Sequence, residues 1–162
     1  MRYAVKQKIF SFGDSFTIRD EAGNDCFAVK GKVFALGDKL KIYDMKGREL
    51  VYIEQKFFRF LPEYSIYYNG QLYATVQKEF TFFKPKFRIY SPQAEYEAEG
   101  NVWGMDFSII RNGKLTALVS KKWFTWSDTY GVDVFEGEDP VLMLALVIVI
   151  DQVIHDGNHH NS

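Results

Sequence analysis

Short runs of apolar and aromatic residues, many alternating with polar ones, recur along most of the chain. Alternation with a period of two is typical of β-strands that have one buried face. Glycine-containing turns separate the runs, and Asn-Gly favours a type I′ hairpin turn, in which both central residues need positive φ. The clearest strand candidates are residues 16–18, 39–43, 50–53 and 87–90, and the clearest turns are 22–24, 46–47, 69–70 and 112–113.

An internal repeat reinforces the prediction of β-hairpins. Residues 65–78 align without gaps on residues 108–121, and both follow the pattern S-I-x-x-N-G-x-L-x-A-x-V-x-K. Each copy encodes a strand, a turn and a returning strand with Leu, Ala and Val on one face, and each is followed by aromatic residues. A weaker copy surrounds Gly47. Repetition at this spacing indicates one hairpin unit reused around a closed sheet, with about a dozen strands in all.

The C-terminal region follows a different pattern. Residues 141–150 are all apolar, and the run continues with interruptions to His155. Asp139 and Pro140 precede it as a capping residue and a favourable first helical residue, which predicts a helix of about 15 residues. A buried strand is the alternative because Val and Ile are abundant, but the length of the run favours a helix. The last residues, 157–162, are expected to form a flexible tail.

A helix that is apolar on every side has to be enclosed by other elements. Its width of about 10 Å does not fit an eight-stranded barrel, which is filled by its own side chains. Wider closed barrels with a central helix do exist, and closure leaves no exposed sheet edge. We therefore predict one mainly β domain over residues 1–156: a closed antiparallel barrel of about twelve strands around a central hydrophobic C-terminal α-helix.

The composition narrows the classes of function. With 20 Lys and Arg against 21 Asp and Glu, the formal net charge is −1, whereas dedicated nucleic-acid binders are strongly basic, so we expect no nucleic-acid partner. Cys26 is the one cysteine, which excludes an internal disulfide. The N-terminus lacks the apolar core of a signal peptide, and residues 141–150 are too few to span a bilayer. We expect a cytoplasmic protein without a transmembrane segment.

No catalytic, cofactor-binding or metal-binding residues are predicted. The common nucleotide-binding, hydrolase and zinc-protease motifs are absent from the sequence. Cys26 lies in a strand pattern without a nearby histidine to activate it, which favours a structural thiol over a nucleophile. His159 and His160 are adjacent tail residues that provide no tetrahedral set. Asp151 interrupts the apolar helix near one mouth of the barrel, where it either belongs to a capped or solvated helix end or makes a polar contact that sets the depth of the helix.

Basic and aromatic residues are combined in two segments, and this combination is the strongest functional signal. Cations beside large rings suit an anionic membrane surface, because the charges meet phosphate and the rings enter the interface. Alternation along a strand offers a second interpretation, in which the cations form the solvated face and the rings the barrel core. The first segment holds Lys78, Lys84, Lys86 and Arg88 among Phe80, Phe82, Phe83 and Phe87; the second holds Lys121 and Lys122 beside Trp123, Phe124 and Trp126.

Taken together, these features resemble the LURP-one-related family, which includes the bacterial YxjI-like proteins. The resemblance rests on the repeated N-G-x-L-x-A-x-V-x-K hairpins, the aromatic runs after them and the closing D-P-apolar-I-D-x-V-I helix, and it extends from Tyr3 to His155. The family implies a tubby-like fold, a barrel around a central hydrophobic helix, similar to tubby C-terminal domains and phospholipid scramblases. Tubby domains bind phosphoinositide headgroups and scramblases act on membrane lipids, so the resemblance implies a connection with lipids without assigning a ligand.

The sequence thus predicts a non-enzymatic binding or scaffold module of the LURP-one-related type, without a cofactor. Its expected partners are anionic phospholipid headgroups, contacted peripherally at the membrane, or a protein. The alternative is a small-molecule carrier or an enzyme with a pocket at the barrel mouth, which would need space that the helix is expected to fill. The residues expected to contact headgroups are Lys78, Lys84, Lys86, Arg88, Lys121 and Lys122.

Overall fold

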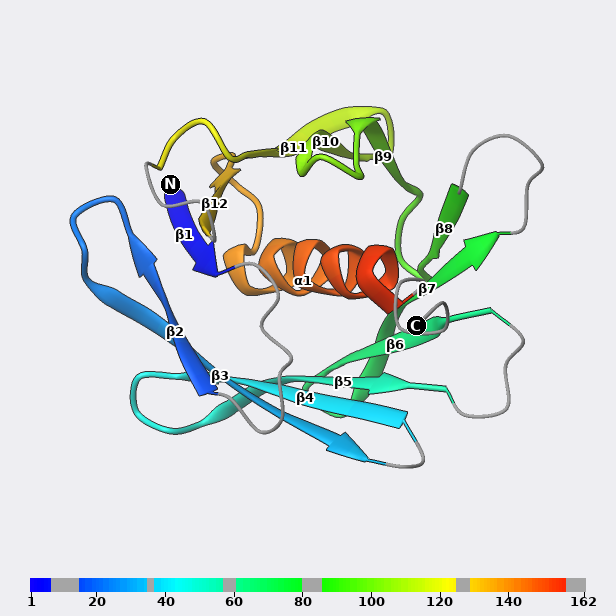
Figure 1. The fold of residues 1–162 in the computed structure, drawn as a ribbon, viewed down its shortest axis with the longest axis horizontal. Helices are drawn as coiled ribbons and strands as arrows, with labels where there is room; N and C mark the ends of the chain where they lie inside the picture. The colour runs from blue at the N-terminus through cyan, green and yellow to red at the C-terminus, as the bar shows by residue number, and fades with distance from the viewer. Residues whose placement is uncertain (7–14, 35–36, 57–60, 80–85, 125–128, 157–162) are drawn as a thin grey trace.

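The computed structural model describes residues 1–6, 15–34, 37–56, 61–79, 86–124 and 129–156. In this part of the chain, twelve antiparallel strands form a closed barrel around one helix, α1 (Pro140–Asp156), as Figure 1 shows, and this confirms the predicted architecture. Neighbouring strands along the chain pair with each other, and β1 closes the barrel against β12. The strands are β1 (Arg2–Lys6), β2 (Ser15–Asp20), β3 (Asp25–Phe34), β4 (Gly37–Asp44), β5 (Glu49–Gln55), β6 (Glu63–Tyr68), β7 (Gln71–Glu79), β8 (Lys86–Tyr90), β9 (Tyr96–Asn101), β10 (Asp106–Arg111), β11 (Lys114–Ser120) and β12 (Thr129–Val134).

Away from the register shifts beside the turns, alternating residues of the strands point into the barrel, as the sequence pattern predicted. Beside the turns the prediction that Leu, Ala and Val of each repeat share a face is wrong, because the register shift leaves Leu72 and Leu115 exposed while Ala74 and Ala117 are buried. In β4 and β5, Ile42 and Ile53 are buried in the core, whereas their neighbours Lys41 and Tyr52 lie on the outer face. The four clearest strand candidates, residues 16–18, 39–43, 50–53 and 87–90, all fall within observed strands. Burial of the inward residues against α1 provides the main favourable free energy of folding.

Both Asn-Gly turns adopt the predicted left-handed conformation. Asn69 and Gly70 have φ values of 50° and 79°, and Asn112 and Gly113 have 51° and 78°. Positive φ at two successive residues matches the right-handed twist of the flanking strands. These turns connect β6 to β7 and β10 to β11, and each hairpin has a register shift beside the turn.

The turns around Gly23 and Gly47 are longer and are stabilised by aspartate side chains. Asp20 and Asp44 each accept hydrogen bonds from the backbone N–H groups two and four residues ahead. These hydrogen bonds lower the pKa of both carboxyl groups. The hairpins β2–β3 and β4–β5 also carry a register shift beside the turn. The weaker sequence copy around Gly47 is therefore the same hairpin unit closed by different turn chemistry.

The barrel has two distinct ends. Because the strands alternate in direction, the hairpins β2–β3, β4–β5, β6–β7 and β10–β11 all turn at the same end, which we call the hairpin end. The last strand, β12, also ends there, and the helix α1 starts at the hairpin end and runs to the opposite, helix-exit end (Figure 1). Arg111 and Glu138 form a bidentate ion pair at the hairpin end, with N–O distances of 3.1 and 2.7 Å, and join β10 to the helix entry.

The helix α1 confirms the capping prediction and excludes the alternative of a buried strand. The Asp139 carboxylate accepts a hydrogen bond from the Val141 N–H at 3.1 Å, which satisfies one of the free amides of the first turn. Every residue from Val141 to Asp151 is buried, and the helix contacts β5, β6, β7, β11 and β12. The tail of residues 157–162 lies outside the described residues.

Candidate functional site

Three of the predicted headgroup-binding residues, Lys78, Lys86 and Arg88, lie on β7 and β8. Lys78 is near the helix-exit end of β7, and its Nζ lies 5.6 Å from the ring centroid of Trp103, a side chain that is 40% exposed. Arg88 on β8 forms an ion pair with Glu79 and donates a hydrogen bond to the Tyr90 hydroxyl. The Arg88 charge is thus already balanced, whereas Lys78 presents its charge beside an exposed indole.

Lys121 and Lys122 follow β11 and are exposed at the helix-exit end. The two aromatic residues after them fold back over the outer face of β12. An added Cβ at Gly131 would lie 2.5 Å from ring carbon Cε3 of Trp123 and 2.9 Å from Cε2 of Phe124. These two rings therefore do not belong to the barrel core, contrary to the second interpretation of the sequence. Their place on the outer face depends on a glycine, because any side chain at that position would collide with them.

The structure brings part of the predicted cluster to one end of the barrel. β7 and β11 run in the same direction, so Lys78 and Lys121 both lie at the helix-exit end, and the β9–β10 connection places Trp103 there too. Three strands, β8 to β10, separate Lys78 from Lys121 around the barrel. Lys84, Phe80, Phe82, Phe83 and Trp126 lie outside the described residues, as does the side chain of Lys86.

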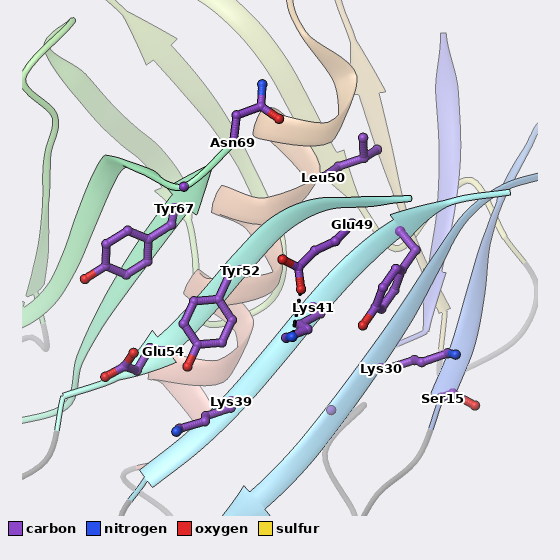
Figure 2. A pocket seen from close by; sticks show the side chains of 13 residues that line it. Ser15, Lys30, Lys39, Lys41, Glu49, Leu50, Tyr52, Glu54, Tyr67 and Asn69 are labelled. Carbon is purple, nitrogen blue, oxygen red and sulfur yellow. Dashed lines mark ion pairs between the residues drawn. The ribbon is translucent and has the colours of Figure 1, made fainter. Parts of the chain in front are cut away.

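The structure also contains a site that the sequence did not predict, a groove of about 910 Å³ on the outer face of β2 to β6. We call it the outer groove. Figure 2 shows that its polar and aromatic side chains project from the outer face of the sheet, which leaves the opposite face to pack on α1. It is lined by Ser15, Lys30, Gly31, Lys39, Lys41, Tyr43, Glu49, Leu50, Tyr52, Glu54, Tyr67, Asn69 and Gly70.

Strand register assembles the centre of this groove. Lys30, Lys41, Tyr52 and Tyr67 are directly opposite one another in succession across β3, β4, β5 and β6. The rings of Tyr52 and Tyr67 stack with centroids 6.0 Å apart and an angle of 29° between their planes. Cross-strand neighbours on one face of a sheet lie about 5 Å apart, so the four side chains form a continuous row with two lysines at one end and two tyrosines at the other.

The charges in the outer groove are partly balanced. Lys41 forms an ion pair with Glu49 at 2.9 Å, and its Nζ lies 5.8 Å from the ring centroid of Tyr52. The Nζ of Lys30 lies 5.2 Å from the centroid of Tyr43. Burial, followed by the hydrogen bond to Glu54, raises the pKa of Tyr52 to about 12. Tyr52 is a neutral hydrogen-bond donor to the Glu54 carboxylate at physiological pH, and charges of both signs lie near it, Lys41 on one hand and Glu49 and Glu54 on the other.

The sequence carried a weak signal for this groove. Lys39, Lys41 and Tyr43 alternate within one predicted strand, as do Tyr52 and Glu54 in the next. Alternation indicates that such residues share a face, but it does not reveal which residues of separate strands lie opposite one another. The register shift between Ile42 and Tyr43 makes that pairing harder still to derive from spacing alone.

Asp151 and Tyr130 are buried polar side chains towards the helix-exit end of the barrel. Asp151 is only 2% exposed, so the interpretation in which it ends in solvent is wrong. Tyr130 on β12 is fully buried, and its hydroxyl has no hydrogen-bond partner among the described residues. Burial, together with the nearby Asp151 charge, raises the pKa of Tyr130 well above its usual value.

Other candidate chemistry is sparse in the described part of the chain. Cys26 is half-buried, and burial raises the pKa of its thiol, so the reactive thiolate is disfavoured. Within the described ranges, no group of three His, Cys, Asp or Glu side chains is arranged to hold a metal ion. Among the same residues, no helix has both the length and the apolar character needed to cross a bilayer.

Comparison with known proteins identifies the family. The model of the LURP-one-related family matches residues 1–151. The chain belongs to the LURP-one-related family. A curated relative from Bacillus subtilis (strain 168), "Uncharacterized protein YxjI", is 39% identical over 152 residues, which cover 94% of this chain and 93% of the relative. The similarity between this LURP-one-related chain and its relative thus extends over nearly the full length of both proteins.

A solved structure has a fold similar to that of this chain. The X-ray structure of a protein from Arabidopsis thaliana superposes on this chain with a TM-score of 0.66 and covers 94% of this chain and 91% of its own. The two sequences are only 19% identical, so this likeness extends to the fold alone. A barrel that persists at such low identity is set by the pattern of buried positions rather than by particular side chains.

Proposed function

We propose that this domain is a non-enzymatic, cytoplasmic binding module whose helix-exit end contacts anionic phospholipid bilayers peripherally. The proposal rests on two pairs of residues at this end of the barrel. The exposed Trp103 lies beside Lys78, and Lys121 and Lys122 are both exposed. Indole rings favour the interface between lipid and water, and lysines favour anionic headgroups.

The expected affinity is modest. Each lysine near an anionic surface contributes about 1 kcal/mol, so Lys78, Lys121 and Lys122 together supply about 3 kcal/mol, with a further contribution from Trp103. Such binding is reversible and sensitive to salt, because the Debye length is about 10 Å at 0.1 M ionic strength. The near-neutral net charge of the protein does not oppose this binding, because a bilayer interacts mainly with the charges closest to it.

The rival function, a carrier or an enzyme with a pocket at the barrel mouth, has less support. In a carrier barrel the interior holds the ligand. Here α1 lies along the interior, and the side chains from Val141 to Asp151 are buried in it. The space that a ligand would need is thus taken by the chain itself.

Sedimentation with vesicles tests the proposal. The full chain should pellet with vesicles that contain phosphatidylserine at low salt, pellet less as salt rises, and stay in the supernatant with pure phosphatidylcholine. The double variant Lys121→Gln, Lys122→Gln should bind several-fold more weakly. The matched control, Lys46→Gln with Lys114→Gln, removes two exposed lysines at the hairpin end and should bind like the parent. Equal loss in both variants, or equal pelleting with neutral vesicles, would overturn the proposal and favour a protein partner instead.

A further inference from the structure

We propose that the outer groove is a binding site for a small molecule that joins a flat aromatic ring to a phosphate or carboxylate group. The site is separate from the helix-exit end, because it lies on the outer face of β2 to β6 and uses none of the residues of the proposed bilayer contact. A mononucleotide has the required chemistry and serves as the probe.

The cationic side of the groove supports the anionic half of such a ligand. Lys30 and Lys41 lie directly opposite each other on β3 and β4. Like charges at opposed positions disfavour the sheet, so folding alone does not account for this pair. Glu49 offsets Lys41, whereas Lys30 lies over the ring of Tyr43 and forms no ion pair with a carboxylate within the described part of the chain. An anion placed beside Lys30 would relieve the repulsion between the two lysines.

The aromatic side supports the planar half. Tyr52 and Tyr67 are half-buried, and Figure 2 shows their rings side by side on the outer face of the sheet. Packing against each other and against the sheet holds the two rings in place, so a flat ligand would meet a platform that is already ordered. Aromatic bases stack on such platforms without regard to base identity.

A lysine lies near each of the two tyrosine rings. Lys41 lies near the ring of Tyr52, and Lys56 lies 5.8 Å from the centroid of Tyr67 and donates a hydrogen bond to its hydroxyl at 3.3 Å. Tyr52 donates its hydroxyl hydrogen to Glu54 and is neutral at physiological pH, so its phenolic oxygen adds no negative charge to that of Glu49 and Glu54 nearby. The two rings therefore present an aromatic surface with a lysine near each of them.

The dimensions match the same class of ligand. Tyr52 on β5 and Lys30 on β3 are separated by two strand spacings, or roughly 10 Å. That spacing is comparable to the separation of base and phosphate in a mononucleotide, and it is too great for a bare phosphate to bridge. The groove volume of about 910 Å³ falls in the range of small-molecule pockets.

Titration followed by NMR or by tyrosine fluorescence tests the proposal with three probes. Adenosine 5′-monophosphate carries both halves, adenosine carries the ring without phosphate, and ribose 5-phosphate carries the phosphate without the ring. We expect the monophosphate to bind at least tenfold more tightly than either half, with shifts confined to β2 to β6. Equal affinity for ribose 5-phosphate and the monophosphate would overturn the proposal by reducing the groove to an anion site. Absence of binding by all three probes at millimolar concentration would also overturn it.

Matched variants locate the binding. Lys30→Gln and Tyr52→Leu should each weaken binding of the monophosphate at least fivefold. Their controls, Lys114→Gln and Tyr90→Leu, remove an exposed lysine and an exposed tyrosine outside the groove and should change it less than twofold. Lys30 is exposed, so its variant keeps the fold intact even if Tyr52→Leu does not. Unchanged affinity in Lys30→Gln would contradict the proposal.

Discussion

Adjacent residues along β4 and β5 lie on opposite faces of the sheet, and the two faces place different requirements on the side chains. Ile42 and Ile53 face α1 and are buried, and their apolar character is what the fold requires. Lys41 and Tyr52 face outward, one residue away along the chain, and they meet across the strands in the outer groove. The inner face depends on hydrophobicity and volume, whereas the outer face depends on which side chains the register places together. Polarity changes should therefore be severe inside and mild outside.

The largest expected effect compares a buried with an exposed leucine. Leu144 on α1 is 0% exposed, and Leu72 on the outer face of β7 is 44% exposed. Leu144→Asp should abolish the cooperative thermal transition, because an unpaired buried carboxylate costs several kcal/mol against a total stability of about 5–15 kcal/mol. Leu72→Asp should stay within about 0.5 kcal/mol of the parent. Circular dichroism melts measure both, and a native melting temperature in Leu144→Asp would disprove the central role of the helix.

A smaller effect should come from the turns, which belong to neither face. Gly70 has a φ of 79°, and no atom lies within 4 Å of an added Cβ, so a substitution there is penalised by the backbone alone. Gly70→Val should lower the free energy of unfolding by about 1–3 kcal/mol, because β-branched residues avoid positive φ. Gly70→Asn should lose less, because Asn tolerates this region. Equal losses in urea unfolding would show that the conformation of the turn is not the cause.

The smallest effect separates two tyrosine hydroxyls, one on each face. The Tyr130 hydroxyl is buried without a hydrogen-bond partner in the described part of the chain, and the Tyr52 hydroxyl bonds to Glu54. Tyr130→Phe should therefore leave stability unchanged or raise it by up to about 1 kcal/mol, since it removes an unsatisfied buried group. Tyr52→Phe should lower stability slightly. If Tyr130→Phe destabilises the protein more than Tyr52→Phe does in parallel melts, then the buried hydroxyl has a stabilising partner.

Most of the fold could be predicted because its determinants are local. The apolar run after Asp139 and Pro140 specified a helix that has to be enclosed, and the Asn-Gly turns specified hairpins with positive φ. Each of these signals lies within a few residues of the chain, where backbone sterics and the period of burial act directly.

Less of the candidate site could be predicted, because its residues meet only through the fold. Lys78 and Lys121 were correctly singled out as equivalent in the repeat, and they lie at the same end because β7 and β11 run in the same direction. The position of Trp103 beside Lys78 depends on the β9–β10 connection, and the sequence pattern gave no hint of it.

Local signals in the chain specified the kind of elements, the buried helix and the hairpin turns, because periodicity, capping and turn chemistry act over short stretches of sequence. Which outward side chains meet depends instead on how the strands are assembled in three dimensions. The register across β3 to β6 assembles Lys30, Lys41, Tyr52 and Tyr67 into one row, and Gly131 leaves room for Trp123 and Phe124 outside the barrel. Such contacts join residues far apart in sequence, so they follow from the closure of the barrel and from packing against it rather than from any local pattern.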